Sequence, residues 1–138
     1  MSTTLRHTGL VVVDLDRAIE FWCGALGFEV WRRMEESGRT LDSVTGLDAV
    51  AVTTVKLIDP NGGMLELLRF HSHPDVPEWT GRLHSTGLSH VALTVDDVEA
   101  VCEKIVEFGG SHHPISVSSD GRVKMTFARS GCCRRGVS

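Results

Sequence analysis

Two histidines and one glutamate have the residue types and positions that a divalent metal ion could use. His7 and His90 each open a β-rich segment, and the segments 7–14 and 90–96 match one another. Glu66 lies in the apolar run 64–68, where an ionised carboxylate is costly to bury unless it is paired or bound to a metal. Imidazole and carboxylate groups are good ligands for first-row divalent ions. We therefore predict that His7, Glu66 and His90 converge on one ion, although each residue taken alone is more often a hydrogen-bonded core or surface residue.

The match between the two histidine segments continues into the residues after them. Apolar residues recur at i, i+3, i+4 and i+7 in both copies, which predicts two amphipathic helices: Ala18, Phe21, Trp22, Ala25 and Val98, Val101, Cys102, Ile105. Asp14 or Asp16 suits the first helix N-terminus, and Asp96 or Asp97 suits the second. Gly27 and Gly109 are typical of the C-terminal stops.

The remaining segments complete a predicted α+β fold. Strands are expected near 28–35, 50–58 and 64–70 in the first copy and near 112–117 and 123–128 in the second, with a turn at 59–63. The chain is thus predicted to be one domain, 1–138, of two tandem β-α-β-β-β modules. Module 1 spans about 5–70, a connector 71–86, module 2 about 87–129 and an atypical tail 130–138. Trp22 and Trp31 are expected in the core.

Composition narrows the class of partner. The chain has 138 residues, 41% apolar and 23% charged, which is ordinary for one globular domain. Its net charge of −4 and lack of basic runs argue against nucleic acid or an anionic membrane as partner. No apolar stretch is long enough to span a membrane, and the N-terminal residues do not form a signal-peptide core, so a cytoplasmic location is expected. The four cysteines form no C-x-x-C pair, and disulfides are not expected.

The other histidines suggest no second metal site. They lie in predicted loops or near strand ends and share neither a face nor a ligand spacing, so they are expected to be surface residues: His71, His73, His84, His112 and His113.

Several segments together resemble the vicinal oxygen chelate superfamily of glyoxalase I, methylmalonyl-CoA epimerase, extradiol dioxygenases and bleomycin-resistance proteins. They are His7-x-Gly-Leu-x-Val, the run 18–22 leading to Leu26-Gly27-Phe28, the 59–62 turn before Leu65-Glu66-Leu67, and the run 88–93. The resemblance implies a cupped mixed sheet of eight strands around the metal, with His7, Glu66 and His90 as its first three ligands. A fourth ligand, usually glutamate, would fall near position 137, where this chain has Val137. The last strand of module 2 is therefore expected to be altered or missing.

The resemblance also implies chemistry. The leading expectation is a glyoxalase I-like or epimerase-like lyase or isomerase that acts on a small carbonyl or thioester substrate through an enediolate or enolate. Its metal would be Zn, Ni, Co, Mn or Fe, and Glu66 would be both a ligand and the possible base. One alternative is an Fe(II) extradiol-type dioxygenase, since two histidines and one carboxylate form the ligand triad of such enzymes. Another is a protein that sequesters a small molecule without turnover. A homodimer is expected.

Overall fold

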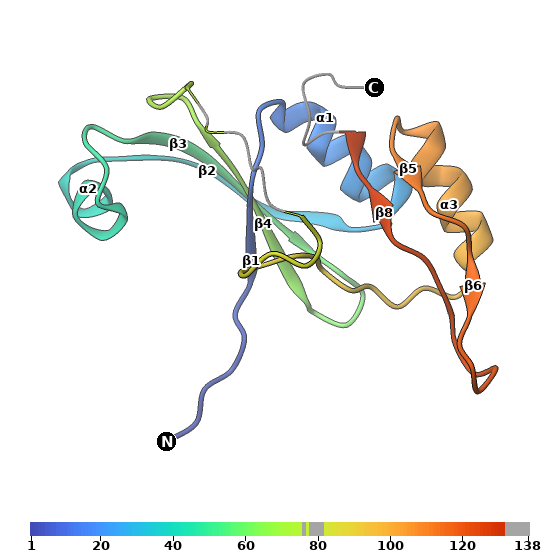
Figure 1. Cartoon of the computed structure of the whole chain (residues 1–138). Coiled ribbons are helices and arrows are strands. Elements are labelled where there is room, and N and C mark those ends of the chain that lie inside the picture. The colour runs from blue at the N-terminus through green and yellow to red at the C-terminus, as the bar shows by residue number, and fades with distance from the viewer. Residues whose placement is uncertain (76, 78–81, 132–138) are drawn as a thin grey trace.

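The first half of the chain forms one four-stranded sheet with a helix on it (Figure 1). The computed structural model describes residues 1–75, 77 and 82–131. In order along the chain, the elements of this half are β1 (Thr8–Val11), α1 (Leu15–Glu20), the π-helical turn η1 (Phe21–Ala25), β2 (Glu29–Ser37), α2 (Arg39–Thr45), β3 (Ala51–Ile58) and β4 (Met64–Phe70). The strand order is β1-β4-β3-β2, with β1 parallel to β4 and the other neighbours antiparallel. The α+β class is confirmed, and only the short helix α2 was not predicted.

Local sequence signals set the ends of the helices. The Asp14 carboxylate accepts a hydrogen bond from the Arg17 amide at 3.1 Å, and Asp97 accepts one from the Ala100 amide at 3.0 Å. Each bond satisfies one of the free amides of a first helical turn. Gly27 and Gly109 have φ angles of +74° and +89°, which glycine adopts without the steric cost of a side chain. Of the alternatives that the sequence left open, Asp14 and Asp97 are the N-caps.

The core lies between the sheet and the helices. It includes Leu57 and Leu67 on the central strands and Ala18 on α1, all of which are fully buried. Helix α3 (Val98–Glu107) lies beside α1 and η1 and adds Ile105 to this cluster (Figure 1). Trp22 is buried as predicted, but Trp31 is 54% exposed. That prediction was wrong because β2 is an edge strand, and its pairing with β3 is irregular between Val30 and Arg32.

The second half does not repeat the four-stranded sheet within the described residues. Its strands have two residues each: β5 (Ser111–His112) pairs with β8 (Ala128–Arg129), and β6 (Ser116–Val117) pairs with β7 (Lys124–Met125). The predicted strands 112–117 and 123–128 are therefore interrupted. The segment 88–95, expected to be the counterpart of β1, has no strand pairing. The irregular connection thus extends from the predicted connector to Asp97 among the residues that the structure describes.

The pairing in the first half gives a physical reason for this difference. The first strand, β1, has a single partner in its sheet, and that partner is the fourth strand, β4. The counterpart of β4 in the second half would follow Arg129. The atypical tail occupies that stretch of sequence, and residues 132–138 lie outside the described part of the chain. No counterpart of β4 is present among the described residues, and 88–95 has no strand partner there.

The described helices are all too short or too polar to cross a lipid bilayer.

Candidate metal centre

The structure brings His7 and Glu66 together on the open face of the sheet. His7 immediately precedes β1, and Glu66 is the third residue of β4. The parallel pairing of these strands sets Gly9 directly beside Glu66. Leu65 and Leu67, which flank Glu66, are buried against the helices, so Glu66 points to the opposite face. The carboxylate therefore reaches the imidazole across two neighbouring strands that are far apart in sequence.

The spacing of this pair is suited to a shared cation. Nε2 of His7 lies 3.6 Å from Oε1 of Glu66, which is too long for a hydrogen bond. Two donors at that separation can both contact one first-row ion at the usual distances of about 2.0–2.2 Å. Nδ1 of His7 is buried and has no hydrogen-bond partner. An imidazole with both nitrogens unsatisfied is costly, and a bound cation would remove part of that cost.

The third predicted ligand, His90, lies elsewhere. It sits in the unpaired segment 88–95, with Nδ1 hydrogen-bonded to the Ser89 hydroxyl at 2.7 Å. Its ring packs edge-on against Phe127, with the ring centroids 5.1 Å apart. No group of three metal-binding side chains exists in the part of the chain that the structure describes. One chain therefore assembles two of the three predicted ligands.

The arrangement of His90 nevertheless suits a ligand. A ligating imidazole commonly has its second nitrogen held by a hydrogen bond, which orients the ring and fixes its tautomer. The Ser89 hydroxyl engages Nδ1 in this way. Nε2 of His90 makes no hydrogen bond with a polar group of the described residues.

Sequence reasoning missed Lys56, which lies opposite Glu66 in the β3–β4 hairpin and on the same face of the sheet. Directly opposite side chains in an antiparallel pair are neighbours, with Cβ atoms about 4.5–5.5 Å apart. The sequence could have revealed Lys56. The 59–63 turn lies midway between Lys56 and Glu66, so a hairpin around it sets these two residues opposite one another. In that turn Asp59 accepts hydrogen bonds from the amides of Asn61 and Gly63 at 2.8 and 2.9 Å. Lys56 adds a positive charge beside the carboxylate.

A second polar cluster, also missed, lies on the opposite face. Thr53 donates a hydrogen bond to Glu35 at 2.5 Å and accepts one from Nε2 of His71 at 2.6 Å. Thr53 is nearly inaccessible to solvent and faces the same side of the sheet as the core residue Leu67. The cluster therefore ties β2, β3 and the end of β4 together and takes no part in the His7–Glu66 site.

The described cysteines are poor candidates for the missing ligand. Cys23 and Cys102 are free thiols. Burial, together with the nearby charge of Glu29, raises the pKa of Cys23, and burial together with Glu99 raises the pKa of Cys102. Metal binding by cysteine requires the thiolate, which a raised pKa disfavours. The cysteines at 132 and 133 lie outside the described residues, as does position 137, where a fourth ligand was expected.

Comparison with known proteins places the chain in a family. Residues 6–128 match the family model of the Glyoxalase/Bleomycin resistance protein/Dioxygenase superfamily. The chain belongs to this superfamily. The match includes His7, Glu66 and His90, and it ends just before the atypical tail.

Individual members of the superfamily agree with this placement. A lactoylglutathione lyase of Haemophilus influenzae is 33% identical over 107 residues, covering 76% of this chain and 67% of that protein. A probable lactoylglutathione lyase of Synechocystis is 28% identical over 107 residues, covering 77% and 70%. The crystal structure of a glyoxalase family protein from Bacillus cereus superposes with a TM-score of 0.86 at 23% identity, covering 94% of this chain and 88% of that one. This last likeness shows the shared fold.

Proposed function

We propose that this chain is a divalent-metal-dependent lyase or isomerase of the glyoxalase type, acting on a small carbonyl or thioester substrate. The observation that carries the proposal is the His7–Glu66 pair, whose 3.6 Å separation and unsatisfied imidazole suit a shared cation. Membership of the superfamily and similarity to two proteins named as lactoylglutathione lyases support the choice of chemistry.

The site residues have distinct roles in this proposal. His7 and Glu66 hold the ion, which when bound would polarise a substrate carbonyl and stabilise the negative charge that develops on its oxygen. Glu66 also accepts the proton from the carbon next to the carbonyl and returns it to a neighbouring atom. Its Oε1 faces His7, whereas Oε2 has no hydrogen bond within the described chain and is available for that proton.

Metal analysis and calorimetry test the proposal directly. We expect zinc, nickel, cobalt or manganese in the purified protein, and conversion of lactoylglutathione is the first activity to assay. Replacing a residue that only hydrogen-bonds to a metal ligand typically weakens metal binding about 10–100-fold. His7→Ala and Glu66→Gln remove proposed ligands themselves and should weaken it by more than that. The control is His84→Ala, which removes an exposed histidine that makes no hydrogen bond with the residues that the structure describes. Equal affinity in all three variants would contradict the site, and iron with ring-cleaving activity would favour a dioxygenase instead.

We further propose that the third ligand is His90 of a second copy of the chain. Strand β1 is a sheet edge with free backbone groups on one side, and Val11 on it is 49% exposed. Segment 88–95 has unpaired backbone and carries the exposed apolar residues Leu88, Val91 and Leu93. The packing of α3 against η1 joins the two halves of one chain through their helices. If β1 of one copy paired with segment 88–95 of the other, the free backbone groups of both would be hydrogen-bonded. His90 of one copy would then come close to the His7–Glu66 pair of the other.

Mixed dimers test this arrangement. A chain carrying His7→Ala and Glu66→Gln is mixed with a chain carrying His90→Ala, after partial unfolding and refolding. Each variant alone should bind metal weakly, whereas the mixture should regain one intact site for each mixed dimer. Sedimentation should show a dimer at micromolar concentration. A stable monomer, or a mixture that binds no better than its components, would overturn the shared site.

A further inference from the structure

A small cavity with basic lining lies in the second half of the chain, away from the His7–Glu66 pair. It has a volume of about 270 Å³ and is lined by Ser111, His112, His113, Phe127 and Arg129. The pairing of β5 with β8 sets Ser111 opposite Arg129. The lining thus combines one arginine, two histidines and a hydroxyl, and it contains no carboxylate.

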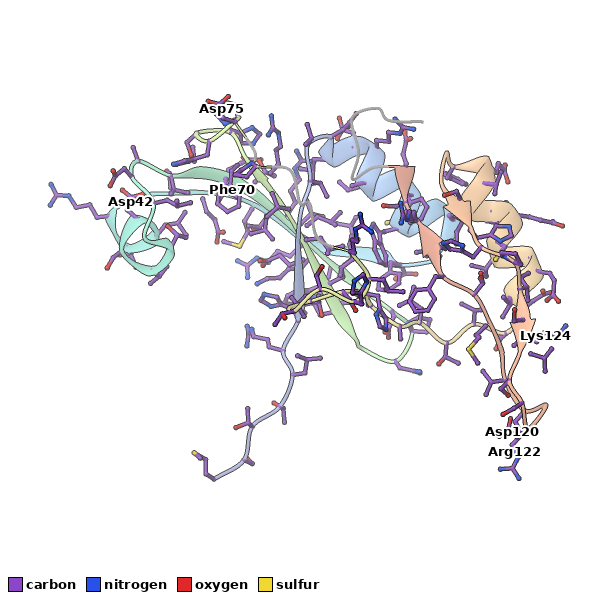
Figure 2. All side chains as sticks on the ribbon, viewed as in Figure 1. Asp42, Phe70, Asp75, Asp120, Arg122 and Lys124 are labelled. Atoms are coloured by element: carbon purple, nitrogen blue, oxygen red, sulfur yellow. The ribbon has the colours of Figure 1, made fainter. Side chains whose placement is uncertain are left out.

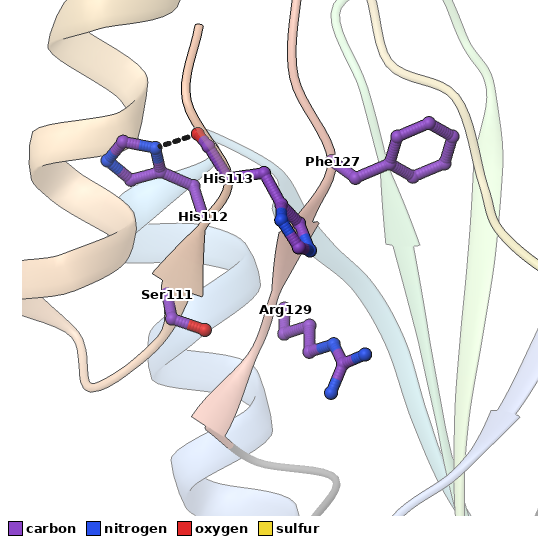
Figure 3. Close-up of a pocket in the computed structure, with 5 residues that line it drawn as sticks. All are labelled: Ser111, His112, His113, Phe127 and Arg129. Carbon is purple, nitrogen blue, oxygen red and sulfur yellow. Dashed lines mark hydrogen bonds between the residues drawn. The ribbon is translucent and has the colours of Figure 1, made fainter. Parts of the chain in front are cut away.

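Three of these polar groups border the same space (Figure 3). Ser111 and His113 are two residues apart on one extended segment and therefore lie on the same side of it. The Arg129 guanidinium and the His113 ring make no hydrogen bond or ion pair with another side chain of the described residues. The His112 ring is turned toward α3, where its Nδ1 donates to the His113 carbonyl oxygen at 2.6 Å (Figure 3). His112 therefore shapes the strand, whereas Ser111, His113 and Arg129 leave hydrogen-bond donors available.

We infer that Ser111, His113 and Arg129 form a subsite for an anionic group, either a carboxylate or a phosphate. Arginine presents planar, paired donors that match both groups, and a hydroxyl and an imidazole can add further hydrogen bonds to the same anion. The volume is below the 300 Å³ or so at which pockets for whole drug-sized ligands begin. It therefore suits one charged group and the few atoms that carry it.

The position of the subsite connects it with the metal centre. Phe127 forms one wall of the cavity, and the His90 ring packs against the same phenyl group. An anion bound to Arg129 would thus be separated by the Phe127 ring from His90, the proposed third metal ligand. That the anion belongs to the substrate rests on the proposed function, which would then act on substrates bearing a carboxylate or a phosphate. Binding of the anion itself does not depend on the metal.

The experiment uses the full chain, treated with a chelator to remove metal and held at constant ionic strength. Inorganic phosphate and acetate are each titrated while the ring signals of His113 are followed by NMR. We expect saturable shifts for at least one anion and a loss of affinity of about tenfold or more in Arg129→Gln. Arg129→Lys, which keeps the charge but not the paired donors, should fall between that variant and the original protein.

Arg122→Gln is the matched control, because it removes the same charge from an exposed turn of the same half (Figure 2). It should bind within about twofold of the original protein. Tighter binding of phosphate indicates a phosphorylated substrate, and tighter binding of acetate indicates a carboxylate. Equal losses in Arg129→Gln and Arg122→Gln, or no shift at His113 with either anion, would overturn the subsite. Because the protein is metal-free in this experiment, its outcome does not depend on whether His7 and Glu66 bind a metal ion.

Discussion

The two halves of this chain share a sequence pattern but differ in how much of it becomes a sheet. In the first half, β4 pairs with β1 on one side and along its whole length with β3 on the other, and the strands and helices of this half supply most of the core. In the second half the helix α3 forms fully, whereas the strands are two residues long and their residues are exposed. The helix satisfies its own backbone, but a strand depends on its neighbours. Without a counterpart of β4 among the described residues, the sheet of the second half is therefore affected and the helix is not.

The largest difference between the two halves is expected in how core substitutions change the free energy of unfolding. Leu67→Ala should lower the free energy of unfolding by about 2–5 kcal/mol, because Leu67 is fully buried and the change leaves a cavity. Val123→Ala in the second half should change it by less than about 0.5 kcal/mol, because Val123 is half exposed. Urea unfolding of both variants measures the contrast. Similar values would show that the second half shares a common core more tightly than the structure indicates.

A designed strand after Arg129 should make the second half more like the first. Replacement of residues 130–138 with a strand patterned on 59–68 would offer segment 88–95 a partner like β4 and would add a carboxylate equivalent to Glu66. We expect slower amide exchange across 88–95, by about tenfold for each 1.4 kcal/mol of local stability gained, and tighter metal binding. A scrambled sequence of the same composition is the control. Unchanged exchange and unchanged affinity would show that the tail is not what limits the second half.

The helix caps should behave alike in both halves. Asp14→Ala and Asp97→Ala each remove one side-chain acceptor from a first-turn amide, at closely similar distances. Each should cost about 1 kcal/mol of stability in thermal or urea unfolding. Asn at either position should recover most of the loss, since its side-chain oxygen can accept the same bond. A much smaller cost at Asp97 would mean that α3 depends less on its cap than α1 does.

The smallest effect is expected at the Lys124–Glu99 ion pair, 2.7 Å long, which joins the second-half strands to α3. Its hydrogen bond lowers the pKa of Glu99 and raises the pKa of Lys124. The contribution of Glu99 is thus present above its unfolded pKa and is lost as the pH falls through the folded value. The contribution of Lys124 is lost at high pH. Because both groups are exposed, Glu99→Gln should flatten this pH dependence with little change near neutral pH. NMR titration of the Glu99 carboxyl measures the shift, and a pKa at or above the ordinary value would contradict the pair.

Much of the fold followed from local patterns that need no knowledge of neighbours. Apolar spacing located α1 and α3, aspartates and glycines marked their ends, and alternation located β2, β3 and β4 to within a few residues. The same reasoning selected His7 and Glu66, which the structure brings to 3.6 Å. These signals can be recognised in the sequence because capping and amphipathicity depend on residues within a turn or two of one another.

Other features depended on pairing, which no local pattern contains. Segment 88–95 reads as a strand, but its hydrogen bonds would have to come from a sequence-distant partner. Trp31 has the composition of a core residue, but the strand order leaves β2 at an edge. His90 matches His7 in the repeat, but it forms no group of three metal-binding side chains with His7 and Glu66 in the described part of the chain. The sequence by itself determined most elements of the first half and the chemical types of the candidate ligands. Only the tertiary structure decided which edges remain open and which ligands meet, because both depend on contacts between segments that are far apart in the chain.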